Sequence, residues 1–340
     1  MELSDYLKRF NDLKYAFAYG SGVFRQTGYT DEEAKKAMID FIIAVDNTSK
    51  WHSINKHLNN QDYSIIKRLP NKTIGKLNNS GGGVYFNTTL VQLEGQRVPR
   101  KMKYGVLSMD SLISDLENWD NLYIAGRLHK PVNVILSNDI IRPSFEKNLK
   151  HAVHVALCIL PTTFTERQLY MAICSLSYMG DIRMGFAENP HKIENIVNGS
   201  YSLFHELYEP IIKNCPYISK QGDLFKQDIS LSTQSSLLSS LPSSLQPSIQ
   251  HIFHLPIVKT HHSLEYDAYY GYIHQMNTYP IMNCNKESYY HELSAIAIQK
   301  GVSNIVRRSS VTQAVKGTFS LGISKSVVYV TQKMLKALKK

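Results

Sequence analysis

The first third of the chain consists of apolar segments of strand length that are separated by polar turns. Residues 16–19 form a short apolar run that ends at Gly20-Ser21-Gly22, which predicts a strand followed by a turn. Residues 38–45 are almost wholly apolar and partly β-branched, a pattern typical of a central strand buried on both faces. Further strands are predicted at 84–87, 103–108, 122–125 and 132–136, helices at 32–37 and 109–116, and a mobile loop at 71–83.

The pattern becomes helical after about residue 145. Helices are predicted at 149–160, 165–177 and 193–208, the last interrupted by Gly199. Residues 231–250 are rich in Ser, Leu and Gln; within them 232–240 is predicted to be a surface loop, with a short helix at 241–252. Helical periodicity returns after Tyr289. We therefore predict an α/β region at 1–145, a mostly helical region at 146–220 and a C-terminal region at 221–340.

Composition narrows the classes of partner. The 340 residues carry a formal net charge of +10, which favours a polyanionic partner: nucleic acid, a nucleotide or an acidic membrane surface. No run reaches the roughly 18 apolar residues that cross a bilayer, so we expect a soluble or peripheral protein. Acidic residues within 1–14 argue against a transit peptide at this end. The cysteines lack Cys-x-x-Cys spacing and are predicted to be reduced packing thiols: Cys158, Cys174, Cys215 and Cys284.

The sharpest local signal is Tyr19-Gly20-Ser21-Gly22 at the end of the first strand. Small residues there let backbone N–H groups approach a phosphate closely, although an ordinary turn has the same composition. Asp40 lies inside the apolar strand that follows, and a buried carboxylate is normally paired or bound to metal. A Gly-Ser turn followed by a strand carboxylate is the arrangement by which polymerase-β-type nucleotidyltransferases hold a nucleoside triphosphate and Mg²⁺. Asp46 at the strand's end is a candidate second ligand, or a helix cap.

Longer motifs extend this interpretation over nearly the whole chain. The chain resembles the mitochondrial translocator assembly and maintenance proteins, which are mitochondrial phosphatidate cytidylyltransferases. The stretches that carry the resemblance are YGSGVFRQ (19–26), MIDFIIAVDN (38–47), WH (51–52), VYFNT (84–88), KYGVLS (103–108), WDNLYIAGRLHKPV (119–132), SYMGDIRMGFAEN (177–189), NIV (195–197) and VRRSSVTQAVKGTFS (306–320).

The resemblance implies a polymerase-β-type nucleotidyltransferase domain, a winged-helix-like domain and Mg²⁺ dependence. It implies transfer of CMP from CTP to phosphatidic acid, which yields CDP-diacylglycerol for cardiolipin and phosphatidylglycerol synthesis, on the matrix side of the inner membrane. The usual nucleotidyltransferase pattern places a second acidic residue two positions after the first, but Ile42 stands there. The second metal ligand therefore stays open between Asp46, Asp139 and a substrate phosphate.

The proposed chemistry needs cations more than bases. Phosphatidate is an ionised phosphate monoester, so the 13 histidines need no catalytic role. Lys103, Arg127 and Lys130 fall on or beside the predicted strands and are candidates, with Tyr19, Gly20 and Ser21, for binding CTP; solvated strand-end charges are the alternative.

A second candidate group is Gly180-Asp181-Ile182-Arg183 in the helical region. Asp181 and Arg183 are expected to reach the cleft as catalytic residues, with Arg183 meeting substrate phosphates bidentately. The alternative is an Asp–Arg ion pair that stabilises a turn.

The last 15 residues carry the membrane prediction. Apolar residues in 326–340 follow one helical face, while Lys333, Lys336, Lys339 and Lys340 populate the other, as in helices that lie on anionic membranes. A helix packed on the core is the alternative.

Two rival functions remain for the protein. One is a nucleotidyltransferase acting on RNA, which is disfavoured because no aromatic-plus-basic RNA-binding motif is found, and the other is a non-enzymatic assembly factor. Oligomeric state is left open.

Overall fold

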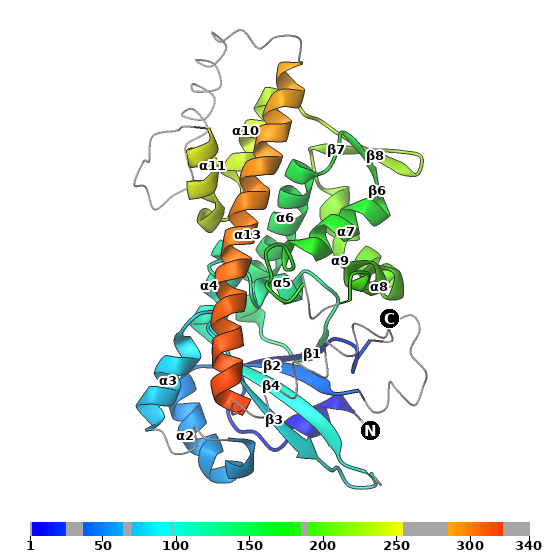
Figure 1. Ribbon diagram of the computed structural model, residues 1–340. Coiled ribbons are helices and arrows are strands. Elements are labelled where there is room, and N and C mark those ends of the chain that lie inside the picture. Colours follow the sequence, from blue (N-terminus) through cyan, green and yellow to red (C-terminus); the bar gives the residue numbers. More distant parts are fainter. Residues whose placement is uncertain are drawn as a thin grey trace.

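A five-stranded mixed sheet forms the lower part of the molecule in Figure 1. The computed structural model describes residues 2–24, 37–63, 70–96, 98–184, 189–253 and 285–321. The sheet order is β3-β4-β2-β1-β5, in which β2 and β4 are parallel and the other neighbours antiparallel. The strands are β1 (Tyr15–Tyr19), β2 (Ile39–Val45), β3 (Tyr85–Val91), β4 (Arg100–Ser108) and β5 (Asn133–Leu136). The prediction of β2 as a buried central strand is confirmed.

Alternation along β2 divides its side chains between two cores. Ile39, Phe41 and Ile43 belong to a core on the face covered by α2 (Thr48–Leu58) and α3 (Asn71–Asn79). Ile42 and Ala44 belong to the larger core on the opposite face, which continues into the helical part. Because successive side chains of a strand point to opposite faces, Asp40 lies on the face of Ile42 and Ala44. The carboxylate therefore faces the helical part.

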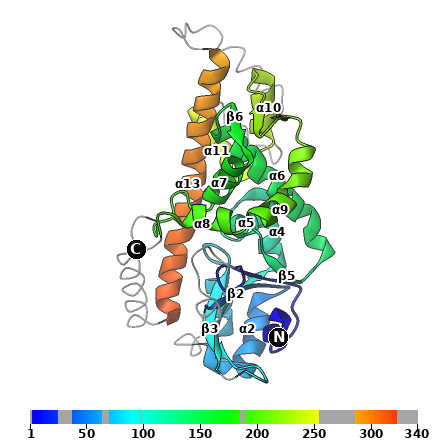
Figure 2. The same cartoon turned by 90° about the vertical axis from the view of Figure 1, so that its right-hand side faces the viewer.

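The helical part is built around the buried helix α6 and carries a small second sheet of order β6-β8-β7. Figure 2 shows α5, α8 and α9 on the side of this part that faces the five-stranded sheet. The remaining elements are α4 (Met109–Asn118), α5 (Ala125–Leu128), α6 (Arg142–Ile159), β6 (Thr163–Thr165), α7 (Glu166–Leu176), α8 (Lys192–Gly199), α9 (Tyr201–Lys213), β7 (Ile218–Gln221), β8 (Leu224–Gln227), α10 (Leu231–Ser239), α11 (Gln246–Ile252) and the 3₁₀ helices η1 (Leu3–Leu7), η2 (Asn60–Asp62), η4 (Asp139–Ile141) and η5 (Ser243–Leu245).

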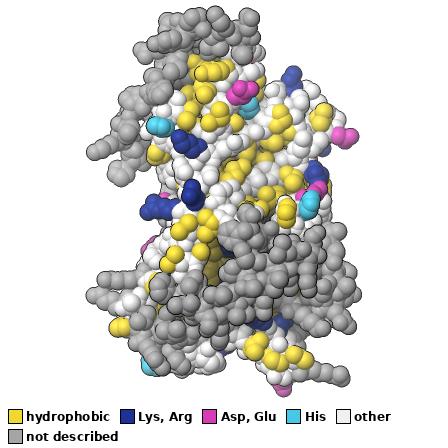
Figure 3. Space-filling view, in the orientation of Figure 1, with side chains coloured by type: hydrophobic (Ala, Val, Ile, Leu, Met, Phe, Trp, Pro, Cys, Tyr) yellow, Lys and Arg dark blue, Asp and Glu magenta, His cyan; other side chains and the backbone are white. Residues whose placement is uncertain are grey.

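One long helix, α13 (Lys286–Leu321), runs beside both parts of the molecule (Figures 1 and 2). Near its C-terminal end, the buried Lys316 Nζ donates to the carbonyls of Asn78 (3.1 Å), Val84 (3.3 Å) and Ser80. These bonds join α13 to the end of α3 and the start of β3. Figure 3 shows hydrophobic and basic side chains on the face on which α13 lies.

Three predicted segments are corrected by the structure. The predicted mobile loop at 71–83 is the helix α3 and a turn that Lys316 anchors. The predicted strand at 122–125 is a turn in which Leu122 has φ +50°, followed by α5. The turn forms because the buried Asp115 carboxylate accepts hydrogen bonds from four backbone N–H groups of residues 121–125. These bonds bend the chain around the carboxylate, so it cannot continue as a strand. The predicted surface loop at 232–240 lies in α10, because Leu237 and Leu238 are buried against the main core.

The predicted region boundaries fall inside continuous elements. Residue 145 lies in the first turn of α6, and residue 220 lies in β7, which pairs with β8 in one hairpin. The amino-acid composition changes near residues 145 and 220, but α6 and the β7–β8 hairpin continue through these positions because they pack as whole elements.

The prediction of reduced packing thiols is confirmed for Cys158, Cys174 and Cys215, which are buried and free. The predicted helix at 109–116 is α4, which Ser108 caps by accepting a hydrogen bond from Ser111 N (3.1 Å). The predicted helix at 32–37, apart from residue 37, and Cys284 lie outside the described residues. Within the part of the chain that is described, no helix is both long and apolar enough to span a bilayer.

Four buried histidines make stability depend on pH. Burial lowers the pKa of His52 and His154 to about 4 and of His129 and His151 to about 3. These side chains take up protons near pH 6.5 in the unfolded chain but not in the folded chain, so their contribution to stability is fully present above this pH and is lost as the pH falls from about 6.5 to about 3. The expected loss approaches about 1.4 kcal/mol per pH unit for each histidine.

Urea denaturation at pH 7.5, 6.0 and 5.0 measures this loss. A His129→Gln variant, whose amide does not titrate, is expected to show a shallower slope. Equal free energies of unfolding at the three pH values would contradict the expectation.

Candidate active site

Three charged or aromatic side chains form a row across the centre of the sheet. Tyr19 on β1 pairs in register with Asp40 on β2, and Asp40 pairs in register with Lys103 on β4. The Asp40 Oδ1 atom lies 3.7 Å from Lys103 Nζ, which also lies 4.4 Å from the centre of the Phe86 ring. Since all three residues share one face, the row presents its side chains toward the helical part.

The Gly20-Ser21 turn lies beside this row, as predicted. Gly20 has φ +81°, and its carbonyl accepts hydrogen bonds from Val23 N (3.0 Å) and Phe24 N (2.9 Å). A Cβ atom on Gly20 would stand 3.8 Å from Asp40 Oδ2, and one on Gly22 would stand 2.2 Å from the Met38 carbonyl oxygen. Only glycine allows this backbone to lie so close to β2, and the turn is thereby held next to the Asp40 carboxylate.

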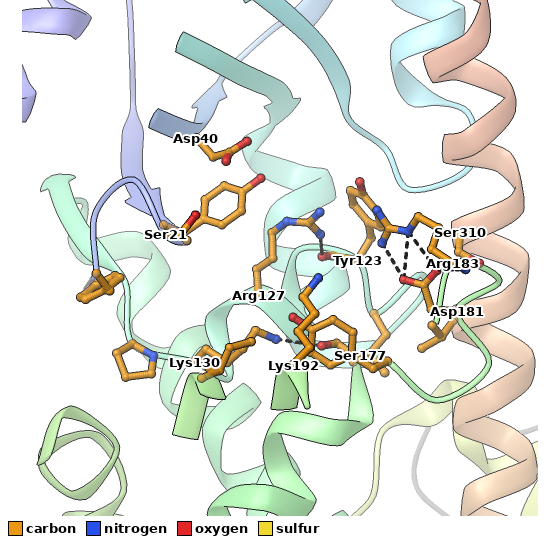
Figure 4. A pocket seen from close by; sticks show the side chains of 18 of the residues that line it. Ser21, Asp40, Tyr123, Arg127, Lys130, Ser177, Asp181, Arg183, Lys192 and Ser310 are labelled. Atoms are coloured by element: carbon orange, nitrogen blue, oxygen red, sulfur yellow. Dashed lines mark hydrogen bonds and ion pairs between the residues drawn. The ribbon is translucent and has the colours of Figure 1, made fainter. Parts of the chain in front are cut away.

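A pocket of about 380 Å³ opens in front of the row and the turn (Figure 4). Its walls come from β1, β2, α5, the turn after α7, α8 and α13. The structure brings together nearly all of the predicted site residues, since these line it: Tyr19, Gly20, Ser21, Asp40, Arg127, Lys130, Asp181 and Arg183. Lys103 joins the site through its ion pair with Asp40.

Arg127 occupies the middle of the pocket in Figure 4. Its guanidinium carbon lies 4.0 Å from the centre of the Tyr123 ring and 5.4 Å from that of Tyr19, and Nη1 donates to the Tyr123 carbonyl. The Nε atom is buried without a hydrogen bond, so this arginine retains donor capacity toward a ligand. Burial tends to raise the pKa of Tyr123, but Arg127, Lys103 and Arg183 outweigh burial and lower it. The pocket therefore has a positive potential.

Asp181 and Arg183 form a bidentate ion pair at the turn after α7. Arg183 Nε and Nη2 lie 3.0 and 2.5 Å from the two carboxylate oxygens of Asp181. Burial tends to raise the pKa of Asp181, but Arg183 outweighs it and holds this pKa below its usual value. The Asp181 side chain is 3% exposed and that of Arg183 is 40% exposed, so only the arginine is well presented to the pocket. The geometry is that of the alternative named for this motif, an Asp–Arg ion pair at a turn, in which Asp181 holds the Arg183 guanidinium.

The lower side of the pocket in Figure 4 contains residues that sequence reasoning did not select. Lys130 Nζ donates to Ser177 Oγ (2.8 Å), and Lys192 approaches Tyr178 (5.0 Å from Nζ to the ring centre). Several of these residues lie in the motifs that carry the family resemblance, SYMGDIR, NIV and VRRSSV, and could have been selected from them. The missed lining residues with polar groups are Tyr123, Ser177, Tyr178, Lys192, Asn195, Ser200, Ser309 and Ser310.

The structure does not bring the two predicted metal ligands, Asp40 and Asp46, together. Asp46 follows the opposite end of β2, six residues from Asp40, which is roughly 20 Å along a strand. Its side chain is 65% exposed and pairs with Lys14 (3.2 Å). Asp139, the other protein candidate, is 93% exposed and pairs with Arg142 (3.0 Å). Among the described residues, no cluster of three or more His, Cys, Asp or Glu side chains could hold a metal.

Asp40 is thus the one predicted metal ligand in the pocket. A single carboxylate beside a tight Gly-Ser turn fits Mg²⁺, which proteins often hold through one or two carboxylates and the phosphates of the substrate. This agrees with the third possibility left open by the sequence, a substrate phosphate as second ligand. The four predicted membrane lysines at 333–340 lie outside the described residues.

Comparisons with known proteins agree with these features. A model of the family described as "Phosphatidate cytidylyltransferase, mitochondrial" matches residues 3–336. Proteins of that name are similar over 96% of this chain: one from Danio rerio is 40% identical (90% of its length covered), one from Bos taurus 39% (91%) and one from Schizosaccharomyces pombe 36% (80%). The resemblance found in the sequence motifs is confirmed. The chain belongs to the family of mitochondrial phosphatidate cytidylyltransferases.

Proposed function

We propose that the protein transfers CMP from CTP to phosphatidic acid, which gives CDP-diacylglycerol and pyrophosphate. Membership of the family supports this activity, because its members bear the name of the reaction. The observation that carries the proposal is the row of Tyr19, Asp40 and Lys103 beside the Gly20-Ser21 turn. The row and the turn together put a carboxylate and a tight glycine backbone on one wall of a pocket whose other walls present cations.

In this proposal, CTP binds with its phosphates against the Gly20-Ser21 turn. Backbone N–H groups of the turn and the Ser21 hydroxyl donate to phosphate oxygens. Arg127 donates from Nε, while Tyr19 and Tyr123 hold its guanidinium in place. Mg²⁺ held by Asp40 and the phosphates would supply positive charge at the α-phosphate.

The transfer step forms one P–O bond and breaks another. A phosphatidate oxygen attacks the α-phosphorus of CTP, and the bond from that phosphorus to the bridging oxygen breaks, so its electron pair leaves with pyrophosphate. The nucleophile has a second pKa near ~6 and is already ionised, so no protein base is required. No histidine is among the described residues that line the pocket. Arg127 and Arg183 face the charge that spreads over the phosphoryl oxygens.

The two parts of the molecule correspond to two domain types in this proposal. We assign the five-stranded sheet to a polymerase-β-type nucleotidyltransferase domain, because a Gly-Ser turn and a strand carboxylate adjoin on its antiparallel pair β1–β2. We assign α6, α7 and the β6-β8-β7 sheet to a winged-helix-like domain, with the β7–β8 hairpin as the wing.

The proposed location is the matrix side of the mitochondrial inner membrane, with peripheral attachment. The word "mitochondrial" in the relatives' names supports the compartment, and the basic, amphipathic pattern of 326–340 supports attachment to anionic lipid. The product would there serve cardiolipin and phosphatidylglycerol synthesis.

Deletion of 326–340 is expected to lower binding to anionic liposomes and activity on bilayer phosphatidate, while leaving CTP binding nearly unchanged. The reason is that the lysines and apolar face of this segment are proposed to contact lipid, whereas CTP contacts the pocket. Liposome co-sedimentation and CTP titration measure the two effects. Unchanged sedimentation would favour a helix packed on the core instead.

One assay tests the activity against its rivals. Purified protein is incubated with Mg²⁺, CTP labelled in the cytidine, and either phosphatidate vesicles or RNA. Label that enters a chloroform-soluble product supports the proposal. Label on RNA would establish the RNA-directed alternative, and absence of transfer to either would favour a non-enzymatic assembly factor.

A further inference from the structure

The pocket has a second cationic end, on the side of Arg127 away from Asp40. We call Lys130, Ser177, Tyr178 and Lys192 the two-lysine end. Lys130 follows α5, Ser177 and Tyr178 follow α7, and Lys192 begins α8. Figure 4 shows Asp40 on one side of Arg127 and Lys130, Ser177 and Lys192 on the other.

Both lysines are held against one aromatic ring. The Nζ atoms of Lys130 and Lys192 lie 5.1 and 5.0 Å from the centre of the Tyr178 ring. Lys130 Nζ also donates to Ser177 Oγ (2.8 Å) and to the Gly126 carbonyl. A Cβ atom on Gly126 would stand 2.5 Å from Ser177 Cβ, so a glycine is needed for this close approach. The position of the Lys130 ammonium is thus fixed by packing before any ligand arrives.

No acidic side chain of the described residues contacts the Lys130 ammonium. The contacts of Lys130 among the described residues are all with neutral groups: a carbonyl, a hydroxyl and an aromatic ring. The two carboxylates that line the pocket are used elsewhere, Asp40 with Lys103 and Asp181 with Arg183. Burial lowers the pKa of Lys130 to about 8, and the positive charges of Arg127 and Lys192 act in the same direction. An anion bound here would stabilise the charged lysine.

We propose that the two-lysine end binds the phosphate monoester of the acceptor, phosphatidate. The inference rests on the proposed function and assigns the second substrate within it. The turn, Asp40 and Arg127 are proposed to hold the triphosphate, and in-line displacement requires the attacking oxygen to enter opposite the leaving pyrophosphate. The two-lysine end lies across Arg127 from Asp40, and we assign the attacking phosphate to this side.

The neighbouring residues suit an amphiphile. Pro131 follows Lys130 directly, and Ile196 lies four residues after Lys192, on the same face of α8; both line the pocket. Apolar atoms beside two ammonium groups match a phosphate attached to a glycerol diester. A cytosine ring, in contrast, carries no negative charge for these lysines to compensate.

The test compares Lys130→Gln and Lys192→Gln with the matched control Lys150→Gln, an exposed lysine on α6 outside the pocket. A short-chain, soluble phosphatidate is used so that membrane attachment does not enter the measurement. KM for phosphatidate is expected to rise about tenfold or more in both pocket variants, with KM for CTP within about twofold of the unmodified protein. The control should change neither constant.

Each outcome decides between the possibilities. A rise in KM for CTP that equals or exceeds the rise for phosphatidate would assign the lysines to the triphosphate and overturn the inference, as would unchanged constants in both variants. If Lys130→Gln fails to fold, as judged by circular dichroism, the half-exposed Lys192 carries the test by itself. Failure of the unmodified protein to make CDP-diacylglycerol would instead refute the proposed function, so the two failures are distinguishable.

Discussion

The Asp40→Asn variant is expected to lose about 10³-fold or more in kcat while its fold is retained. Asparagine has the shape of aspartate but lacks the charge that would hold Mg²⁺ beside the α-phosphate, and electrostatic stabilisation of a phosphoryl transition state is a large term. Binding of CTP should weaken much less, because Arg127 and the Gly20-Ser21 turn are unchanged. Steady-state kinetics with saturating CTP and phosphatidate, together with CTP titration, measure the two effects separately.

The structure offers a matched control in Asp46→Asn. Asp46 follows the same strand but lies at its opposite end, 65% exposed and outside the main pocket. Its replacement is expected to leave kcat within about twofold, as for most exposed charges. Comparable losses in the two variants would restore the predicted Asp40–Asp46 pair, and an active Asp40→Asn variant would remove Asp40 from the reaction.

The Arg127→Lys variant is expected to lower kcat/KM for CTP by about 10²-fold although the charge is kept. Lysine cannot supply the planar fork of donors, and its ammonium cannot stack between Tyr19 and Tyr123 as the guanidinium does. The free energy equivalent is about 2.7 kcal/mol of transition-state stabilisation. The matched control is Arg142→Lys, which makes the same substitution at an exposed position outside the pocket and should leave both constants unchanged.

Measurement of kcat and KM for both substrates separates two explanations. If kcat/KM for CTP falls while kcat at saturating CTP is unchanged, Arg127 is a ground-state binding residue. A loss that persists at saturation would show that it acts in the transition state. No loss in either constant would contradict the role of the buried, unbonded Nε.

Much of the sheet could be predicted because its signals are local. The apolar run at 38–45 and the Gly-Ser-Gly turn depend only on residues adjacent in sequence, and both were found in the structure. The errors arose where a distant contact decides local structure. The chain at 122–125 curls around the buried carboxylate of Asp115, and the glycine-rich turn at 80–83 is held by Lys316, more than 230 residues later.

In the candidate site, too, local sequence patterns identified residues, whereas distant contacts decided how these residues are arranged. The sequence patterns identified Asp40, Arg127 and Arg183 as candidates. They could not show that Asp181 is buried and paired with Arg183, or that Lys130 and Lys192 both lie near one tyrosine ring. Such relations depend on how α7, α8 and α13 pack, and side chains from far-apart segments meet only when the core has formed.

The sequence by itself determined the residue types at the candidate site: a tight glycine turn, one strand carboxylate and an excess of cations. It could do so because glycine, a buried carboxylate and strand alternation carry their physical constraints within a few neighbouring positions. Only the tertiary structure decided which charges act together. The register of three strands aligns Tyr19, Asp40 and Lys103, and the length of β2 carries Asp46 out of reach. Packing of the helices on the opposite side then encloses the pocket, because burial of their apolar faces fixes the cations they carry.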